Sequence, residues 1–318
     1  MNHLKWGRVR ARAVGTFVHH LKGARARALG TCALAAVLAG PVAPVPARAG
    51  SAFAMNPIWD DGKAEVSTYT GTTVRYGKPR PTRARMIVVK EDLVRATLVK
   101  SDAGPLPGRT LEALKLLFIA DFPTGTYDYH QMASLFFQRA SLDVLKETMS
   151  HTEGCGITFV RVGPRHGQLV HEAHSYWDGE ADREVAVLWP AADRPRLWWD
   201  ALPVALRPWT EGPDRFETKV WLLPGQVSGR SPIESTRPVE ATLRGQGTWP
   251  LDVPAGHFET RRIAVLSPGG ADLFWFDARP PHVLVMVQTA VGRKLRLQRT
   301  VRLDYWNHRD PGDEKRVD

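Results

Sequence analysis

The sequence predicts a mostly β protein, built from antiparallel curved sheets or half-barrel, clam-like lobes with one or two short helices. Three observations lead to this prediction. Segments rich in β-branched residues recur at intervals of roughly ten residues between turn signals. Helical periodicity is scarce, and the last long apolar segment alternates between apolar and polar side chains, as a half-buried strand does.

The clearest strands are expected in the last third of the chain. They cover residues 256–266, 271–277, 282–290 and 293–306. The connections SPGG, ARPP and VG have the composition of turns. In the last of these segments, leucine, valine and tyrosine alternate with lysine, arginine and glutamine, so one face should be buried.

Strands are also expected earlier in the chain, at residues 64–75, 83–92, 156–163, 167–177 and 180–189. The segment GKPRPT (77–82) should separate the first two of these strands, because it is rich in turn residues. The dipeptide Asp178-Gly179 predicts a hairpin between the last two.

Two segments carry helical spacing. Residues 193–207 predict a helix that is short or broken, because Pro203 interrupts it. Residues 132–150 fit either one apolar helical face or two strands, and we expect strands.

The basic charge of the chain is concentrated in its first 49 residues. The formal net charge is +10, but eight of the 43 Lys and Arg residues lie in 1–49, which hold no Asp or Glu. Residues 50–318 therefore have 35 basic against 33 acidic side chains, a net charge of +2. A nucleic-acid partner is not expected from so balanced a composition.

Residues 1–49 have the pattern of a cleaved signal peptide: a basic region, the apolar run 28–40, and Ala47-Arg48-Ala49 before the cut. We therefore expect export, to the periplasm or the extracellular space, and no transmembrane span in the mature chain. Residues 50–207 are expected to form an N-terminal β-rich lobe, residues 208–310 a C-terminal antiparallel β lobe, and residues 311–318 a disordered tail.

Five segments occur in an order that resembles a family of exported bacterial proteins of unknown function. They are 59–80, TGTYDY (124–129), EGCG (153–156), SYWDGEAD (175–182) and the closing FWFD and YW block. Members of this family are sometimes labelled septum formation inhibitor, a label we regard as misapplied. The resemblance covers nearly all of the chain after the leader and implies export and a β fold. It supplies no catalytic residue. The C-terminal half is also similar to exported half-barrel proteins that hold lipid.

Cys155 is the one cysteine outside the leader, so no internal disulfide is possible in the mature chain. It is a candidate nucleophile, with His151 as its base and Glu153 to orient that base. The opposing interpretation is structural, and we favour it. Gly154 and Gly156 indicate a tight turn, with the thiol packed at the base of the strand that follows.

No metal ion or cofactor is expected. The segment HGQLVHEAH (166–174) lacks the HExxH zinc motif. A strand there would place His171 and His174 on opposite faces, so we expect solvent-facing histidines. The acidic residues of 178–182 do not continue as a calcium-binding loop, and a hairpin turn is expected instead.

Tryptophans supply the remaining candidates for a site. Ten lie outside the leader, and they would either fill a β core or line an apolar cavity. The candidates for ligand binding are Trp177, Trp189, Trp221 and Trp275. The leading hypothesis is a non-enzymatic envelope protein that binds an apolar ligand such as a lipid. A hydrolase that uses Cys155 and a structural partner in the envelope are the alternatives.

Overall fold

The computed structural model describes residues 52–317 of the 318-residue chain. The predicted signal peptide (1–49) lies outside the described residues. Most of the regular structure is β, as the sequence predicts, and the helices are single short turns.

The strands fall into two groups along the chain. The first group is β1 (Ala64–Arg75), β2 (Lys78–Val94), β3 (Thr110–Pro123), β4 (Asp128–Gln138), β5 (Val144–Glu153), β6 (Gly156–Arg165), β7 (Gln168–Ser175) and β8 (Arg183–Ala186). The second group is β9 (Arg196–Trp198), β10 (Arg215–Leu223), β11 (Val239–Val253), β12 (Gly256–Ser267), β13 (Gly270–Asp277), β14 (Leu284–Gln288) and β15 (Lys294–Leu303). The α-helices are α1 (Ala52–Met55) and α2 (Leu202–Ala205). The 3₁₀ helices are η1 (Pro57–Asp60), η2 (Trp199–Ala201), η3 (Arg207–Thr210), η4 (Ile233–Thr236), η5 (Tyr305–Asn307) and η6 (Asp313–Arg316).

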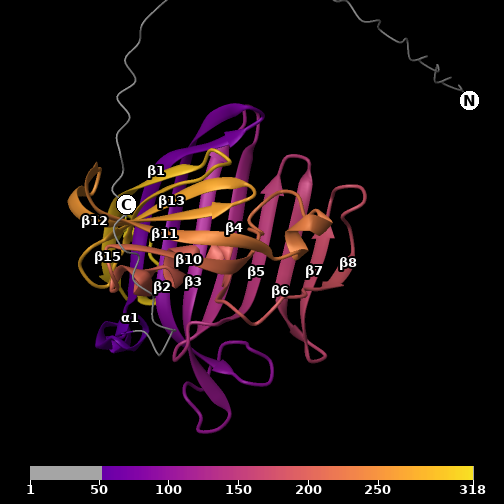
Figure 1. The fold of residues 1–318 in the computed structure, drawn as a ribbon, viewed down its shortest axis with the longest axis horizontal. Coiled ribbons are helices and arrows are strands. Elements are labelled where there is room, and N and C mark those ends of the chain that lie inside the picture. Colours follow the sequence, from indigo (N-terminus) through magenta and orange to yellow (C-terminus); the bar gives the residue numbers. More distant parts are fainter. Residues whose placement is uncertain (1–51, 318) are drawn as a thin grey trace, which may run out of the picture. The chain divides into compact units, whose positions relative to one another are not determined.

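The fifteen strands of the described residues form one sheet (Figure 1). Its order is β8-β7-β6-β5-β4-β3-β2-β1-β15-β14-β13-β12-β11-β10-β9. The chain therefore runs as two antiparallel meanders, and the pairing of β1 with β15 joins them. The short β9 pairs parallel with β10, and β8 and β9 are the two edges.

The β1–β15 seam requires a glycine. A Cβ atom at Gly71 would lie 1.8 Å from the carbonyl oxygen of Lys294, and backbone atoms on a paired strand have little room to move. The register of the seam also shifts between Thr68 and Tyr69. Gly71 thus permits the close backbone approach that connects the two halves of the sheet.

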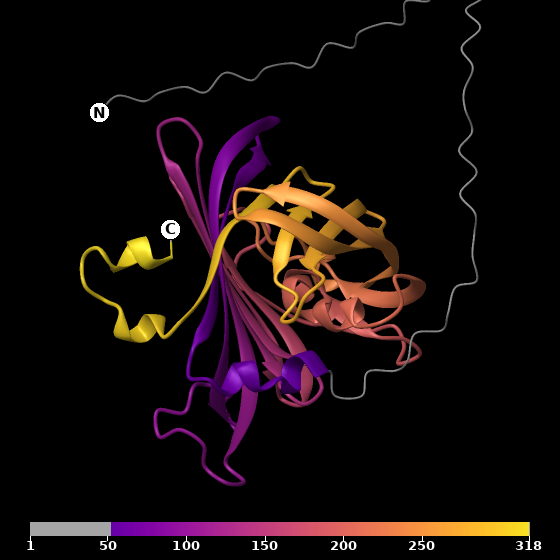
Figure 2. The same ribbon diagram turned by 90° about the vertical axis from the view of Figure 1, so that its left-hand side faces the viewer.

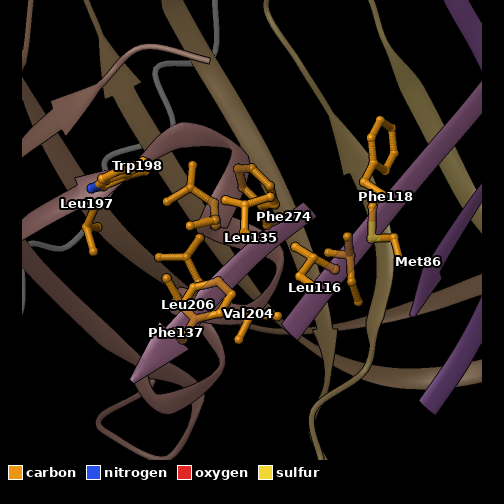
Figure 3. Close-up of a cluster of buried hydrophobic side chains, with 14 of the residues drawn as sticks. Met86, Leu116, Phe118, Leu135, Phe137, Leu197, Trp198, Val204, Leu206 and Phe274 are labelled. Atoms are coloured by element: carbon orange, nitrogen blue, oxygen red, sulfur yellow. The ribbon is translucent and has the colours of Figure 1, made fainter. Parts of the chain in front are cut away.

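The sheet curves so that β10–β14 lie against one face of the first meander (Figure 2). Side chains from both meanders share one hydrophobic core. Leu116 and Leu135 of β3 and β4 meet Phe274 of β13 in that core (Figure 3). Each of these three side chains is at most 1% exposed. The alternation of buried and exposed positions along β3 and β4 is the period-2 pattern that a single buried face produces.

The segment that connects the two meanders fills the space between them. The sequence predicts a broken helix at 193–207, and the structure has β9 followed by the short helices η2, α2 and η3. Leu202, Val204 and Leu206 in this segment are fully buried. Arg207 anchors the segment to β1 through a buried bidentate ion pair with Glu65, at 2.7 and 2.9 Å.

Several local predictions are confirmed and two are wrong. Residues 132–150 form β4 and β5, as expected, rather than a helix. The segment GKPRPT (77–82) is not a connection, because the β1–β2 turn is made by Tyr76 and Gly77 and the prolines lie inside β2. They are tolerated there because β3 pairs with β2 only from Arg83 onward, so this stretch has a neighbour on one side only.

The C-terminal residues also differ from the prediction of a disordered tail (311–318). Residues 313–316 form η6, and Val317 is buried against the opposite face of β1 and β2 from the main core. Thr68 Oγ1 donates to the carbonyl oxygen of Val317 at 3.1 Å. Figure 2 shows this segment on the far side of the sheet from β10–β14.

Candidate functional site

A cleft of about 540 Å³ lies between the first meander and the strands β10–β14. It forms where the end of β1 meets the β12–β13 and β14–β15 turns. This volume falls within the range of about 300–1,000 Å³ that small-molecule sites occupy. A narrower inner pocket continues from the cleft toward the core and shares five lining residues with it: Trp199, Asp200, Val227, Thr289 and Arg293.

The inner pocket is apolar. Its walls include Met86, Leu116, Phe118, Leu135 and Phe274, which converge from the two meanders in Figure 3. Little free space remains among these side chains, about 30 Å³, so the outer cleft offers most of the room.

The outer cleft is amphipathic. The polar side comes from β1, β4, β5 and the β14–β15 turn, and consists of Thr73, Arg75, Gln131, His151, Thr289 and Arg293. The apolar side comes mostly from β10, β11, η2 and the residues after β10, and includes Trp199, Leu222, Pro224, Val227 and Val239. The two sides face one another because the sheet folds one meander over the other.

One wall of the cleft is a strap, residues 224–231, which follows β10. Hydrogen bonds tie the strap to β6, β7 and the β7–β8 turn. They include His171 Nε2 to Gln226 Oε1 (2.9 Å), Thr158 Oγ1 to Gly229 O (2.9 Å) and Ser231 N to Glu180 Oε2 (2.7 Å). These contacts hold the strap against the first meander.

A chain of hydrogen bonds runs along the polar side of the cleft. Arg293 Nη2 donates to Gln131 Oε1 at 2.5 Å, and Gln131 Nε2 lies 3.2 Å from His151 Nδ1. Because a guanidinium can only donate, the amide oxygen of Gln131 must face Arg293 and its NH₂ must donate to His151. His151 therefore accepts at Nδ1 and carries its proton on Nε2.

His151 is held neutral by its surroundings. The side chain is buried, and burial lowers its pKa to about 4, a shift that the Glu153 carboxylate only partly opposes. Its Nε2 has no hydrogen-bond partner among the described residues and lies against Gly229 of the strap. A Cβ at Gly229 would approach Nε2 to 2.7 Å, so the strap reaches this position only with glycine.

Arg75 lies at the outer part of the polar side. Its Nε and Nη2 each donate to the hydroxyl of Tyr129 at 3.2 Å, and Nη2 is 3.6 Å from a carboxylate oxygen of Glu153. The Tyr76 hydroxyl lies 2.8 Å from that of Tyr129, and burial raises the pKa of Tyr129. Arg75 thus brings a second positive charge to the cleft.

A pair of buried carboxyl groups includes one residue that lines the cleft, Asp200. Glu147 of β5 and Asp200 of η2 interact, and burial raises the pKa of both. The neighbouring Asp200 charge raises the pKa of Glu147 further, well above its usual range. The raised pKa favours the protonated form of Glu147, while Asp200 accepts a hydrogen bond from the backbone N–H of Gln226.

The candidate nucleophile and its partners do not line a common site. Cys155 is exposed at the β5–β6 turn, so the prediction that it is packed at the base of a strand is wrong. The turn itself is confirmed. Its glycines are explained by two rings: a Cβ at Gly154 would lie 2.7 Å from Cγ of Tyr127, and one at Gly156 2.5 Å from Cγ of Tyr176.

The partners of Cys155 make other contacts. His151 bonds to Gln131 and lines the cleft, whereas Cys155 does not line it. The Glu153 side chain is buried and faces Arg75. Of the three candidates, His151 alone belongs to the cleft.

The four candidate tryptophans lie elsewhere. None of Trp177, Trp189, Trp221 and Trp275 lines the cleft or the inner pocket. Each has an arginine over its ring: Arg230, Arg196, Arg194 and Arg262, respectively, at 4.7 to 5.9 Å from the ring centre. The tryptophan that does line the cleft is Trp199, whose Nε1 donates to Asp272 at 2.6 Å.

The histidines of 166–174 are divided between the two faces of β7, as expected. His174 is exposed, but His171 is fully buried, so the expectation that both face solvent is wrong for His171. Its hydrogen bond to Gln226 explains the burial, because this bond holds the strap. Within residues 52–317, no group of three or more His, Cys, Asp or Glu side chains is arranged to hold a metal ion.

Sequence reasoning missed Arg293, Gln131 and Asp200. Arg293 directly follows the VG connection, next to other basic residues, and Gln131 lies on the otherwise apolar buried face of β4. One signal was available for Asp200, a carboxylate inside the apolar run LWWDALPVAL.

In the described part of the chain, no helix has the length and apolar character needed to cross a bilayer. Comparison with protein families gives no match, and comparison with curated protein sequences gives none. Among solved structures, the chain is similar to a β-barrel-like protein of the domain of unknown function DUF1849 from Brucella abortus. The two share 8% sequence identity with a TM-score of 0.44, over 76% of this chain and 98% of that one.

Proposed function

We propose that this protein binds a small molecule with an apolar part in the cleft between its two meanders. The observation that carries the proposal is the cleft itself, about 540 Å³ and lined mainly by apolar atoms, with a few polar groups on one side. Such a combination is typical of ligand sites, in which apolar walls supply affinity and a few polar groups fix orientation.

Binding is favoured over catalysis by the placement of the reactive groups. Cys155 lies outside the cleft. The side chain that hydrogen-bonds His151 in the cleft is the amide of Gln131, which is not a nucleophile. Neither the hydrolase that uses Cys155 nor a purely structural role in the envelope gives a reason for the cleft.

We propose that the protein acts in the cell envelope, because its sequence resembles exported proteins and residues 1–49 have a signal-peptide pattern. Expression of the full chain in a bacterial host tests this part. A secreted product whose mass corresponds to a start at Gly50 supports it, and retention of the intact leader in the cytosol counts against it.

The binding proposal is tested by displacement of N-phenylnaphthylamine, a neutral probe whose fluorescence rises in apolar sites. Val227 lines both the cleft and the inner pocket, so Val227→Trp should fill their junction and weaken probe binding about tenfold. Leu188→Trp, at an exposed position, is the matched control and should bind the probe as the wild type does. Equal binding by wild type and Val227→Trp would place the probe elsewhere and defeat the proposal.

A further inference from the structure

The polar side of the cleft contains the positively charged side chain of Arg293, which forms no ion pair with a carboxylate of the described residues. Arg293 uses Nε to reach Thr73 Oγ1 at 3.3 Å and Nη2 to reach Gln131 Oε1 at 2.5 Å. Its Nη1 makes no hydrogen bond to the described residues, and no carboxylate of that part of the chain lies within 4 Å of the guanidinium. Nη1 is not enclosed by protein, so its donors are open to the cleft.

We propose that the ligand is a single-chain amphiphile with an anionic head group, which the Arg293 guanidinium binds through Nη1 while the apolar chain lies along the Trp199 and Val227 side. This inference rests on the proposed function, because it names the chemical class of the molecule that occupies the same cleft.

The unpaired charge is the first argument. Arg293 is partly buried, hydrogen-bonds Thr73 and Gln131 and lies over the Phe118 ring, but it has no anionic partner among the described residues. Proteins generally pair a charge that is taken out of water. Burial lowers the pKa of Arg293 to about 10, an effect that the more distant Asp200 carboxylate partly offsets, so the side chain is still charged at neutral pH. An anion at Nη1 would supply the missing partner in a charge-assisted hydrogen bond.

The acidic groups of the cleft are already engaged, which is the second argument. Asp272 accepts from Trp199 Nε1 at 2.6 Å and from the backbone N–H of Ala290 at 2.8 Å. Asp200 accepts from the backbone N–H of Gln226 and interacts with Glu147, whose pKa is raised by burial. A cationic head group would therefore have to compete with these bonds, whereas an anionic one meets an open donor.

Arg75 adds a third argument. It lines the same cleft, and its Nη1 likewise makes no hydrogen bond to the described residues. Its ion pair with Glu153 is long, at 3.6 Å, and its side chain is 27% exposed. The charge at the outer part of the cleft is thus available to attract an anion before Arg293 binds it.

The apolar side of the cleft would contact the apolar chain of the ligand. Trp199, Leu222, Val227 and Val239 line the cleft, and the indole N–H of Trp199 is already donated to Asp272. A molecule that spans the cleft would place a charged end at the β14–β15 turn and an apolar body against these residues. Single-chain carboxylates and single-chain phosphates share this chemistry.

The experiment compares decanoate, decyl phosphate, decanol and decylamine as competitors of N-phenylnaphthylamine at pH 8. We expect the wild type to bind decanoate or decyl phosphate at least about tenfold more tightly than decanol, with decylamine the weakest. The two anions distinguish a carboxylate ligand from a phosphate ligand. In Arg293→Gln the preference for the anion over decanol should disappear. Arg296→Gln, an exposed cation three residues along the chain, should retain the preference.

The outcomes separate the two proposals. If neither the probe nor decanol binds the wild type, the proposed function fails. If both bind but the anions show no preference, or if Arg293→Gln keeps the preference, only the inference about the head group fails. Should Arg293→Gln not fold, the order of the four competitors on the wild type decides, and decylamine equal to decanoate would overturn the inference.

Discussion

Arg293 and Gln131 stand 162 positions apart in the sequence, and the 2.5 Å hydrogen bond from Nη2 to Oε1 joins the β14–β15 turn to β4. The bond connects the two meanders across the cleft. It also sets the orientation of the Gln131 amide and thereby the protonation of His151, so a residue of the second meander determines the proton position on a residue of the first.

His151 should remain neutral until about pH 4, with its proton on Nε2. Its folded pKa of about 4 lies below the ordinary histidine value of 6.5, so its contribution to stability is complete above pH 6.5 and is lost as the pH falls through 4. Nitrogen-15 NMR of the histidine rings checks both the tautomer and the titration. His151→Gln should reduce the loss of unfolding free energy between pH 6.5 and 4.

The exposed His174 provides the control, because it takes no part in the chain from Arg293 through Gln131, and His174→Gln should leave the tautomer and titration of His151 unchanged. A His151 ring that titrates near pH 6.5, or that carries its proton on Nδ1, would contradict the hydrogen-bond chain from Arg293 through Gln131.

Glu147→Gln should stabilise the protein at neutral and alkaline pH. Burial raises the folded pKa of Glu147 above the ordinary glutamate value of 4.5, so its contribution to stability is complete below pH 4.5 and is lost as the pH rises toward the folded pKa. The unfolding free energy of the variant should therefore exceed that of the wild type by an amount that grows by up to about 1.4 kcal/mol per pH unit. Urea unfolding at pH 5, 7 and 9 measures the difference.

Glu259→Gln is the matched control, because the Glu259 side chain is 60% exposed. It should change the unfolding free energy little at any of the three pH values. If the unfolding free energies of the wild type and Glu147→Gln differ by the same amount at pH 5 and pH 9, the pKa of Glu147 is not raised in the folded protein.

Gly71→Ala should break the seam between the two meanders. The added Cβ would lie 1.8 Å from the carbonyl oxygen of Lys294, so β1 and β15 must separate locally and lose hydrogen bonds. We expect a loss of about 3 kcal/mol or more in the free energy of unfolding. Gly212→Ala is the control, since its Cβ would meet nothing nearer than 3.7 Å, and it should unfold at nearly the wild-type denaturant concentration.

Cys155 should react in the folded protein. Its exposure predicts modification by Ellman's reagent at a rate close to that measured in denaturant, in a chain carrying Cys32→Ala so that Cys155 is the remaining thiol. The same chain carrying also Cys155→Ser should release no thiolate. Labelling that begins only after denaturation would contradict the exposed turn.

The sequence allows much of the fold to be predicted, because strand alternation and turn composition are local. The limits of β1 agree with the prediction, and β12 and β13 agree to within one residue at each end. The β2 prolines misled the prediction, since their tolerance depends on where β3 stops pairing, which is a non-local property.

The site was less predictable for the same reason. The cleft depends on β1 pairing with β15 and on the curvature that turns β10–β14 over β4. Neither property can be predicted from the sequence of a single segment. His151 was singled out as a base for Cys155, but its partners Gln131 and Arg293 are supplied by other strands. Trp199 lines the cleft where its neighbour Trp198 fills the core, a distinction set by η2 rather than by residue type.

The most direct test of the central claim is a crystal structure of the protein with ω-bromododecanoate, because the anomalous signal of bromine locates the end of the chain. We expect the carboxylate about 3 Å from Nη1 of Arg293 and the bromine beside the apolar wall that includes Trp199 and Val227. A bromine site outside the cleft, or a carboxylate directed away from Arg293 toward solvent, would contradict the account.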